Sequence, residues 1–110
     1  MAGDLWLRAR EALLRGEAVA VATITRTWGH SPREVGAKML VFRDGRILGT
    51  VGGGCGESEI RMAALQSLDS GQPRICLVNL TADFRQDEGA ICGGRLEIFV
   101  EPLLPQAGAS

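Results

Sequence analysis

The chain has 110 residues, of which 45% are hydrophobic and 23% charged, and its formal net charge is −1. A length near the commonest domain size predicts one domain with a single hydrophobic core. The near-zero charge and the scarcity of aromatic residues disfavour nucleic-acid binding, and no apolar run reaches the length of a transmembrane helix. Three cysteines without a signal peptide predict a reduced, cytoplasmic protein.

The first third of the sequence predicts a helix, a buried strand and a loop. The helix begins at the N-cap residue Asp4 and runs to about Arg15, with Gly16 just beyond its end. Residues 18–25 form a continuous run of small and β-branched side chains, which is typical of a central strand covered on both faces. Residues 27–36 predict a loop, because glycine and proline interrupt the pattern.

A β-hairpin is predicted next. Residues 38–42 and 46–51 have the apolar character of strands, and they flank the dipeptide Asp44-Gly45. Aspartate and glycine tolerate positive φ, so this dipeptide favours a two-residue turn of type I′. The two strands are therefore expected to lie side by side and antiparallel.

A second helix is predicted after the hairpin. It starts at about Cys55 or Glu57, runs to Leu68 and stops before Gly71. Its apolar residues recur at helical spacing, which indicates one buried face. The residues expected on that face are Ile60, Ala63, Ala64 and Leu68.

Two further strands complete the predicted sheet. Residues 74–80 form one, and residues 95–100 form a last alternating strand that Pro102 ends. The element order predicts an α+β (mixed α/β) fold, in which two helices pack on a mixed sheet of about five strands. We expect one domain over residues 1–104 and a frayed tail at 105–110. A free strand edge makes a homodimer possible.

Two cysteines lie inside glycine-rich segments, at residues 52–57 and 89–94. Glycine adds no side chain to a core, so repeated glycines beside a thiol indicate tight turns or close approach of a ligand. The first segment joins a strand to a helix, where free N–H groups and the helix dipole favour an anion. It matches neither the G-x-G-x-x-G nor the Walker A motif, which disfavours ordinary nucleotide binding.

The cysteines allow more than one interpretation. At the start of a helix Cys55 would have a lowered pKa, but a small buried residue in a tight turn is an equally simple explanation. A zinc site from Cys55, Cys92 and His30 lacks the usual paired ligand spacing and is disfavoured. Cys76 lies in an apolar strand, which favours a place in the core.

With these residues in view, the chain resembles the N-terminal domain of the XdhC/CoxI family, the xanthine dehydrogenase accessory proteins. The matching motifs are S-P-R-x-x-G-A-K-M at 31–39, G-G-G-C-x-E at 52–57, C-G-G at 92–94 and E-I-F-V-E-P at 97–102. They follow the family's order and span nearly the whole chain. Two features differ, because many members carry a second, Rossmann-like domain and Gly56 stands where a larger apolar residue is common.

What the resemblance implies is a maturation factor rather than an enzyme. Family members bind and protect the molybdenum cofactor (molybdopterin), and they help to deliver its sulfurated form to molybdenum hydroxylases such as xanthine or carbon monoxide dehydrogenase. Their partners are the target enzyme and a cysteine desulfurase. Molybdopterin carries a phosphate, a flat pterin and a dithiolene-bound metal, which suits a glycine-lined helix start with a thiol.

The expected cofactor site has three parts: a glycine cradle, two thiols near the metal or its sulfur, and a polar rim. The thiols, which are also the candidate metal ligands, belong to Cys55 and Cys92. The whole set is Ser31, Arg33, Lys38, Gly52, Gly53, Gly54, Cys55, Glu57, Cys92, Gly93 and Gly94. Two other functions stay open: a small thiol-dependent redox or transferase enzyme with Cys55 as nucleophile, and an interaction subunit that binds no cofactor.

Overall fold

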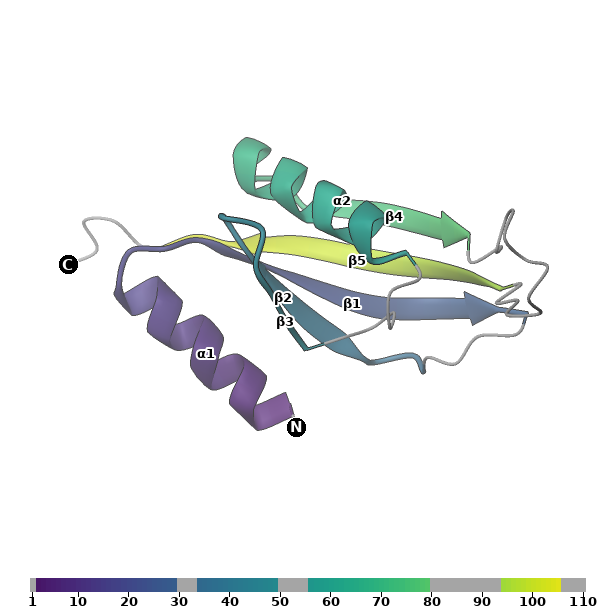
Figure 1. The fold of residues 1–110 in the computed structure, drawn as a ribbon, viewed down its shortest axis with the longest axis horizontal. Coiled ribbons are helices and arrows are strands. Elements are labelled where there is room, and N and C mark those ends of the chain that lie inside the picture. Colours follow the sequence, from purple (N-terminus) through teal and green to yellow (C-terminus); the bar gives the residue numbers. More distant parts are fainter. Residues whose placement is uncertain (1, 30–33, 50–55, 80–93, 106–110) are drawn as a thin grey trace.

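The computed structural model describes residues 2–29, 34–49, 56–79 and 94–105 of the chain. These residues form two helices and one five-stranded sheet with the strand order β3-β2-β1-β5-β4 (Figure 1). No helix among them is long and apolar enough to cross a membrane. The elements are α1 (Ala2–Leu14), β1 (Val19–Trp28), β2 (Lys38–Phe42), β3 (Ile47–Gly49), α2 (Glu57–Ser70), β4 (Arg74–Asn79) and β5 (Arg95–Leu103).

The predicted α+β class is confirmed, with one difference in the sheet. All four described strand pairings are antiparallel, so the sheet is not mixed. A hairpin turn joins β2 to β3, and α2 connects β3 at one edge of the sheet to β4 at the other edge. The strand predicted to be central is confirmed, because β1 lies in the middle of the sheet.

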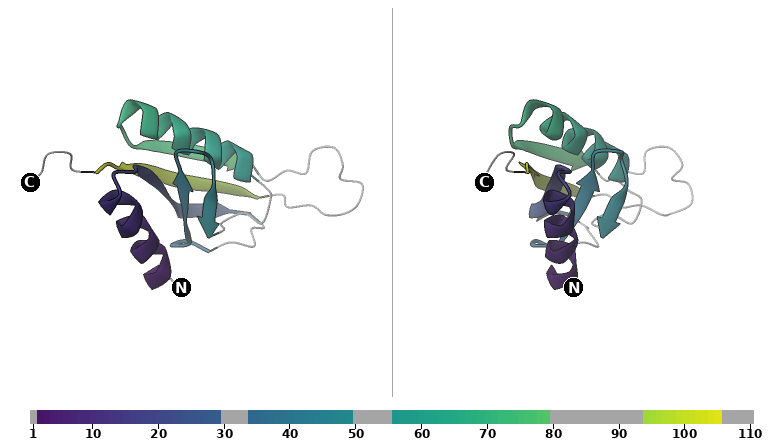
Figure 2. Two further views of the ribbon diagram at one scale, coloured as in Figure 1. Left: turned by 60° about the vertical axis from the view of Figure 1, so that its left-hand side comes forward. Right: turned by 90° about the vertical axis from the view of Figure 1, so that its left-hand side faces the viewer.

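The two helices cover opposite faces of the sheet (Figure 2). Alternate residues of β1 point to the two sides, so each face contributes to its own apolar cluster. The cluster under α2 contains Ala18, Ala20, Ala22, Ile24, Met39, Val41, Ile60, Ala64, Leu68, Val78, Leu96, Ile98 and Val100. The cluster under α1 is smaller and contains Leu5, Ala9, Ala12, Val19, Val21, Leu40 and Phe42.

Helix α1 begins earlier than the sequence predicted. It starts at Ala2, so Asp4 lies inside its first turn and is not the N-cap residue. A carboxylate in the first turn still interacts favourably with the helix dipole, which explains why the same residue type fits either position. The predicted end is confirmed, because Gly16 follows the last turn with a φ of 85°.

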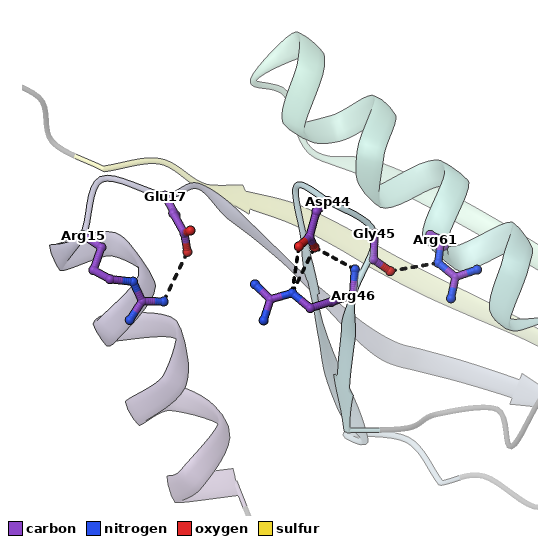
Figure 3. Close-up of polar contacts among 6 residues, drawn as sticks. All are labelled: Arg15, Glu17, Asp44, Gly45, Arg46 and Arg61. Atoms are coloured by element: carbon purple, nitrogen blue, oxygen red, sulfur yellow. Dashed lines mark hydrogen bonds and ion pairs between the residues drawn. The ribbon is translucent and has the colours of Figure 1, made fainter.

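The hairpin between β2 and β3 has a different turn from the one predicted. The N–H of Gly45 donates to the carbonyl of Phe42 at 2.8 Å, and the N–H of Phe42 donates to the carbonyl of Arg46 at 2.8 Å. These bonds enclose three loop residues, with positive φ at Gly45, instead of a two-residue type I′ turn. Asp44 accepts from the main-chain N–H of Arg46 at 3.0 Å, which stabilises the longer loop (Figure 3).

Helix α2 starts at the later of the two predicted positions and is tied to this hairpin. Its N-cap residue Gly56 has a φ of 80°, a left-handed conformation that a larger apolar residue adopts at a cost. Its end is capped by Gly71 as predicted.

Helix α2 also contacts the hairpin between β2 and β3. Arg61 donates from Nε to the carbonyl of Gly45 at 3.1 Å (Figure 3). Of the predicted buried face, Ala63 is only half-buried, and Ser67 is buried in its place.

The last strand continues past the proline that was expected to end it. Pro102 lies within β5, opposite Ala20 of β1. The pairing of β5 with β4 stops at Arg74 and Val100, so among the described residues β1 is the one partner of this part of β5. Proline lacks an N–H, and it is accepted where a strand has a neighbour on one side only.

Candidate functional site

The elements that flank two of the predicted cofactor segments, those around 30 and 92, meet at one end of the sheet, which we call the loop end (Figure 1). Strand β1 ends there at Trp28 and β5 begins there at Arg95, whereas β3 ends at Gly49, in register with Met39 of β2 and Ala22 of β1. Helix α2 begins at the same end, after Gly56. The antiparallel pairing of β1 and β5 therefore places the described residues next to the segments around 30 and 92 side by side.

Three of the predicted site residues lie among the described ones. Lys38 is the first residue of β2, Glu57 is the first residue of α2, and Gly94 is buried directly before β5. Gly94 belongs to the loop end, whereas Lys38 pairs with Thr23 in the middle of β1. The remaining predicted residues lie outside the described residues and stay predictions: Ser31, Arg33, Gly52, Gly53, Gly54, Cys55, Cys92 and Gly93.

Lys38 borders a groove between α1 and the β2–β3 hairpin. Its side chain is half-buried, with Nζ 3.3 Å from Oγ1 of Thr23 and 6.0 Å from the ring centroid of Trp6. The groove has a volume of about 830 Å³, within the range of sites for small organic molecules. Its lining combines apolar and charged side chains: Asp4, Leu5, Leu7, Arg8, Glu11, Gly36, Ala37, Lys38, Leu48 and Gly49.

The wall of this groove depends on Gly49. A Cβ at this position would lie 3.1 Å from the carbonyl oxygen of Lys38 and 3.2 Å from Cδ1 of Leu5, and the residue has a φ of 84°. A larger residue would therefore push α1 and the hairpin apart or strain the backbone. Because Gly49 is the last residue of β3, the groove reaches the point where the chain enters the first glycine-rich segment.

A second group of candidate residues lies where β1 and β5 pair beyond the ends of β2 and β3. A β-bulge falls between Ile24 and Arg26 of β1. Oγ1 of Thr25 donates to the side-chain Oε1 of Glu97 at 2.9 Å, which fixes the bulge. Bulges turn the following side chains and occur often beside functional sites. After this bulge Arg26 lies opposite Glu97, and Trp28 lies opposite Arg95.

The bulge produces a cationic cluster around one aromatic ring, which we call the Trp28 cluster: Arg26, Trp28 and Arg95. The guanidinium carbons of Arg26 and Arg95 lie 5.8 Å and 5.5 Å from the ring centroid of Trp28. Trp28 stays 38% exposed. Arg26 also approaches Glu97, with Nε 4.0 Å from Oε1, and this exposed ion pair holds it weakly. The cluster can present two positive charges to an anion at the loop end.

Sequence reasoning did not find the Trp28 cluster. Trp28 itself belongs to the segment preceding the S-P-R motif, but nothing in the sequence pairs it with Arg95, 67 positions further along. The pairing depends on the β1–β5 register and on the bulge at Thr25, and both are properties of the sheet. The signal that could have suggested it is the arginine two residues before the tryptophan, which places both on one face of a strand.

Cys76 is less buried than the sequence predicted. Its side chain packs against the cluster under α2, yet the residue is only half-buried. Burial is the main cause that raises the pKa of the Cys76 thiol, so this cysteine is a poor nucleophile. Among the described residues no group of histidine, cysteine and acidic side chains could hold a metal ion. The proposed ligands Cys55 and Cys92 lie outside that part of the chain.

The groove lining has a mixed charge. It carries the basic side chains of Arg8 and Lys38 and the acidic ones of Asp4 and Glu11. The Trp28 cluster adds two guanidinium groups further along β1, five residues beyond Thr23, the partner of Lys38. Guanidinium groups of this kind can bind a phosphate or another anion, and the groove is large enough for a small organic molecule.

Comparison with known proteins identifies the family. Residues 12–83 match the model of the XdhC and CoxI family, so the chain belongs to that family. The chain is similar to the molybdenum cofactor insertion chaperone PaoD of Escherichia coli K12, with 32% identity over 100 residues, 84% of this chain and 29% of the relative. It is also similar to the uncharacterized protein YqeB of the same organism, with 36% identity over 81 residues, 74% of this chain and 15% of the relative.

A solved structure supports the same relationship. The crystal structure of a xanthine dehydrogenase from Bacillus halodurans superimposes with a TM-score of 0.70 at 28% identity. The match covers 87% of this chain and 30% of that one. The chain thus spans less than a third of the length of each of these three relatives.

Proposed function

We propose that this protein is a maturation factor that binds the molybdenum cofactor and delivers it to a molybdoenzyme. The observation that supports this most directly is family membership together with the similarity to PaoD, a molybdenum cofactor insertion chaperone. The pairing of Trp28 with Arg95, which places the described residues beside the segments around 30 and 92 next to each other, adds support from the fold. The protein acts as a carrier in the cytoplasm, not as an enzyme.

The cofactor would be held at the loop end by positive side chains and by glycine backbone. The Trp28 cluster attracts the terminal phosphate of molybdopterin, and Lys38, beside Thr23 in the middle of β1, adds a positive charge further along the same strand. Gly52, Gly53 and Gly54 precede α2, where free N–H groups and the positive end of the helix dipole favour the same charge. Ser31 and Arg33 complete the polar rim, with Glu57, Gly93 and Gly94 beside it.

The two thiols of the glycine-rich segments would serve the metal end of the cofactor. Cys55 and Cys92 are proposed to lie near the molybdenum or its terminal sulfur, which soft thiolates suit as ligands. The molybdenum atom supplies the oxidation chemistry of the target hydroxylase when the cofactor is bound there. The carrier's residues bind the cofactor and shield it from water, and a cysteine desulfurase is the expected source of the sulfur.

Binding measurements on substituted proteins test this function. The purified protein is expected to retain molybdopterin in ultrafiltration, with cofactor fluorescence as the readout. Cys55→Ala removes a thiol, and Gly53→Val blocks approach to the backbone, so each variant should bind at least about tenfold more weakly. Cys76→Ala is the matched control, because this thiol lies in β4 on the sheet and should leave affinity unchanged. Equal affinity in the wild type and in both site variants would remove the assignment.

A further inference from the structure

Strand β4 is an edge strand without the usual protection. Among the described residues it is paired on one side only, with β5, and the register of that pairing is regular from Arg74 to Asn79. Ile75 and Leu77 are 64% and 57% exposed. Edge strands normally avoid pairing with other chains through charge, proline, a bulge or short length. The interior of β4 has none of these, whereas β3 at the opposite edge is only three residues long.

We propose that β4 pairs antiparallel with β4 of a second copy of this chain, around a two-fold axis at Cys76, and so joins two sheets into one. A two-fold axis perpendicular to the sheet leaves the α2-covered face of both copies on the same side of the joined sheet. Directly opposite residues must therefore have side chains on the same face, which requires the axis to pass through a residue and not between two residues. Registers centred on Cys76 and on Leu77 meet this condition and pair the most residues. The chemistry of the side chains distinguishes between them.

The register centred on Cys76 gives the better side-chain pairs. It places Ile75 opposite the partner's Leu77, and by symmetry this contact occurs twice on the exposed face. Apolar and β-branched neighbours across two strands stabilise a sheet. The register centred on Leu77 instead places Ile75 opposite the partner's Asn79, which leaves an apolar side chain beside an amide. Burial of the four exposed apolar side chains therefore favours the Cys76 axis.

Charge complementarity on the other face supports the same register. Arg74 and Glu59 both act on the pKa of the Cys76 thiol, in opposite directions because their charges are opposite, so both lie near it. Helix α2 ends next to the start of β4, and its first turns lie over the end of that strand (Figure 1). The axis at Cys76 places Arg74 opposite the partner's Val78, close to the first turns of the partner's α2. In this register Arg74, whose Nη1 donates to Oε1 of Gln66 in its own chain, comes near the partner's Glu59.

The edge also has space for a paired strand. A cavity of about 460 Å³ lies between α2 and the start of β4, and it is lined by Ala63, Gln66, Pro73, Arg74 and Ile75. A paired strand would bring its own side chains into this space. The same few residues supply both halves of the interface, so a second copy satisfies the pairing, the apolar contact and the charge without any other partner. The interface does not depend on cofactor binding.

Sedimentation velocity over a wide concentration range tests the interface. The wild type is expected to show a concentration-dependent dimer. Leu77→Lys should weaken the dimer at least about tenfold, because it places a charge at the centre of the apolar contact. Leu14→Lys is the matched control, since Leu14 is 75% exposed on α1, away from β4, and should leave the dimer unchanged. A monomer at every concentration would overturn the proposal.

Two further variants test the register itself. Arg74→Glu should weaken the dimer, and the double variant Arg74→Glu with Glu59→Arg should restore it, which loss of folding cannot imitate. Oxidation of a Cys55→Ser, Cys92→Ser variant should yield a covalent dimer through Cys76, because residues on the axis lie directly opposite each other. A dimer that is unaffected by both Leu77→Lys and Arg74→Glu, and that forms no Cys76 cross-link, would overturn this interface.

Discussion

The two faces of the sheet differ in how completely they are covered, and the difference separates stability from binding. Helix α2 covers one face with a continuous apolar cluster that spans four strands. Helix α1 covers only part of the other, mainly over β1 and β2 (Figure 2). The remainder, which we call the open face, carries exposed and charged residues: Arg26, Ile75, Leu77, Arg95 and Glu97.

This asymmetry shows which part of the molecule is available for partners. Apolar residues under α2 are almost fully buried, so that face holds the fold together. The open face and the loop end carry the Trp28 cluster, the edge strand β4 and the groove beside α1. A contiguous exposed patch beside an uncapped strand edge marks a binding surface. Substitutions on the two faces should therefore have opposite consequences for stability and for association.

The largest expected effect is loss of stability from a cavity under α2. Ile98→Ala removes a side chain that is 0% exposed, and it should lower the free energy of unfolding by about 2–4 kcal/mol. Ile75→Ala makes the same chemical change on the open face of the neighbouring strand and should cost no more than about 0.5 kcal/mol in dilute protein. Urea denaturation measures both. Equal losses would show that the two faces do not differ.

The next effect concerns the contact between α1 and the hairpin. Gly49→Ala introduces a Cβ into space occupied by Lys38 and Leu5 and requires a positive φ, so it should cost about 1–3 kcal/mol. Gly36→Ala is the matched control, because its φ is also positive but nothing lies within 4 Å of the added Cβ. Thermal unfolding should show the larger shift for Gly49→Ala. The opposite order would contradict the close packing of α1 on this face.

A smaller effect is expected for the one polar side chain buried under α2 in the described part of the chain. Oγ of Ser67 donates to the carbonyl of Gln72 at 2.6 Å and so connects the end of α2 to the turn before β4. Ser67→Ala removes this hydrogen bond and should cost about 1 kcal/mol. Urea denaturation at constant m-value is the measurement. No loss, or a gain from the added apolar burial, would contradict a structural role for the bond.

The smallest effect is a pH dependence at Cys76. Burial raises the pKa of this thiol, with Glu59 adding to the shift and Arg74 opposing it. The neutral thiol is favoured in the folded state, so its contribution to stability is present below the unfolded pKa and is lost as pH rises through the folded one. In a Cys55→Ser, Cys92→Ser variant, alkylation of Cys76 should keep accelerating above the pH at which a free cysteine levels off. A plateau at the free-thiol pH would disprove the shift.

Local signals explain the parts of the fold that were predicted correctly. The central position of β1 follows from its unbroken apolar run, because only a strand covered on both faces tolerates such a sequence. Gly16 and Gly71 indicated the helix ends, because glycine adopts the positive φ of a helix C-terminus readily and this preference does not depend on distant residues. The location of the turn at Asp44 was also predicted, but its three-residue length was not.

The errors arose where a neighbouring strand decides the outcome. Pro102 was expected to end β5, but the strand continues through it. The proline fits there because the pairing with β4 stops at Val100, so no neighbouring strand on that side needs its missing N–H. Arg26 and Arg95 were not predicted as a pair, because their meeting at Trp28 depends on the bulge at Thr25 and on the β1–β5 register. Register is set by contacts between residues far apart in sequence, and a single sequence does not reveal it.

The amino-acid sequence alone determined the secondary-structure elements, the glycine-rich segments and, through its motifs, the family. These depend on local backbone preferences and on residue spacing, which act within a few positions of the chain. Only the tertiary structure decided which helix covers which face, which edge strand stays exposed, and which arginines surround Trp28. Those features follow from the antiparallel strand order, because pairing brings together residues whose separation in sequence carries no information about their distance in space.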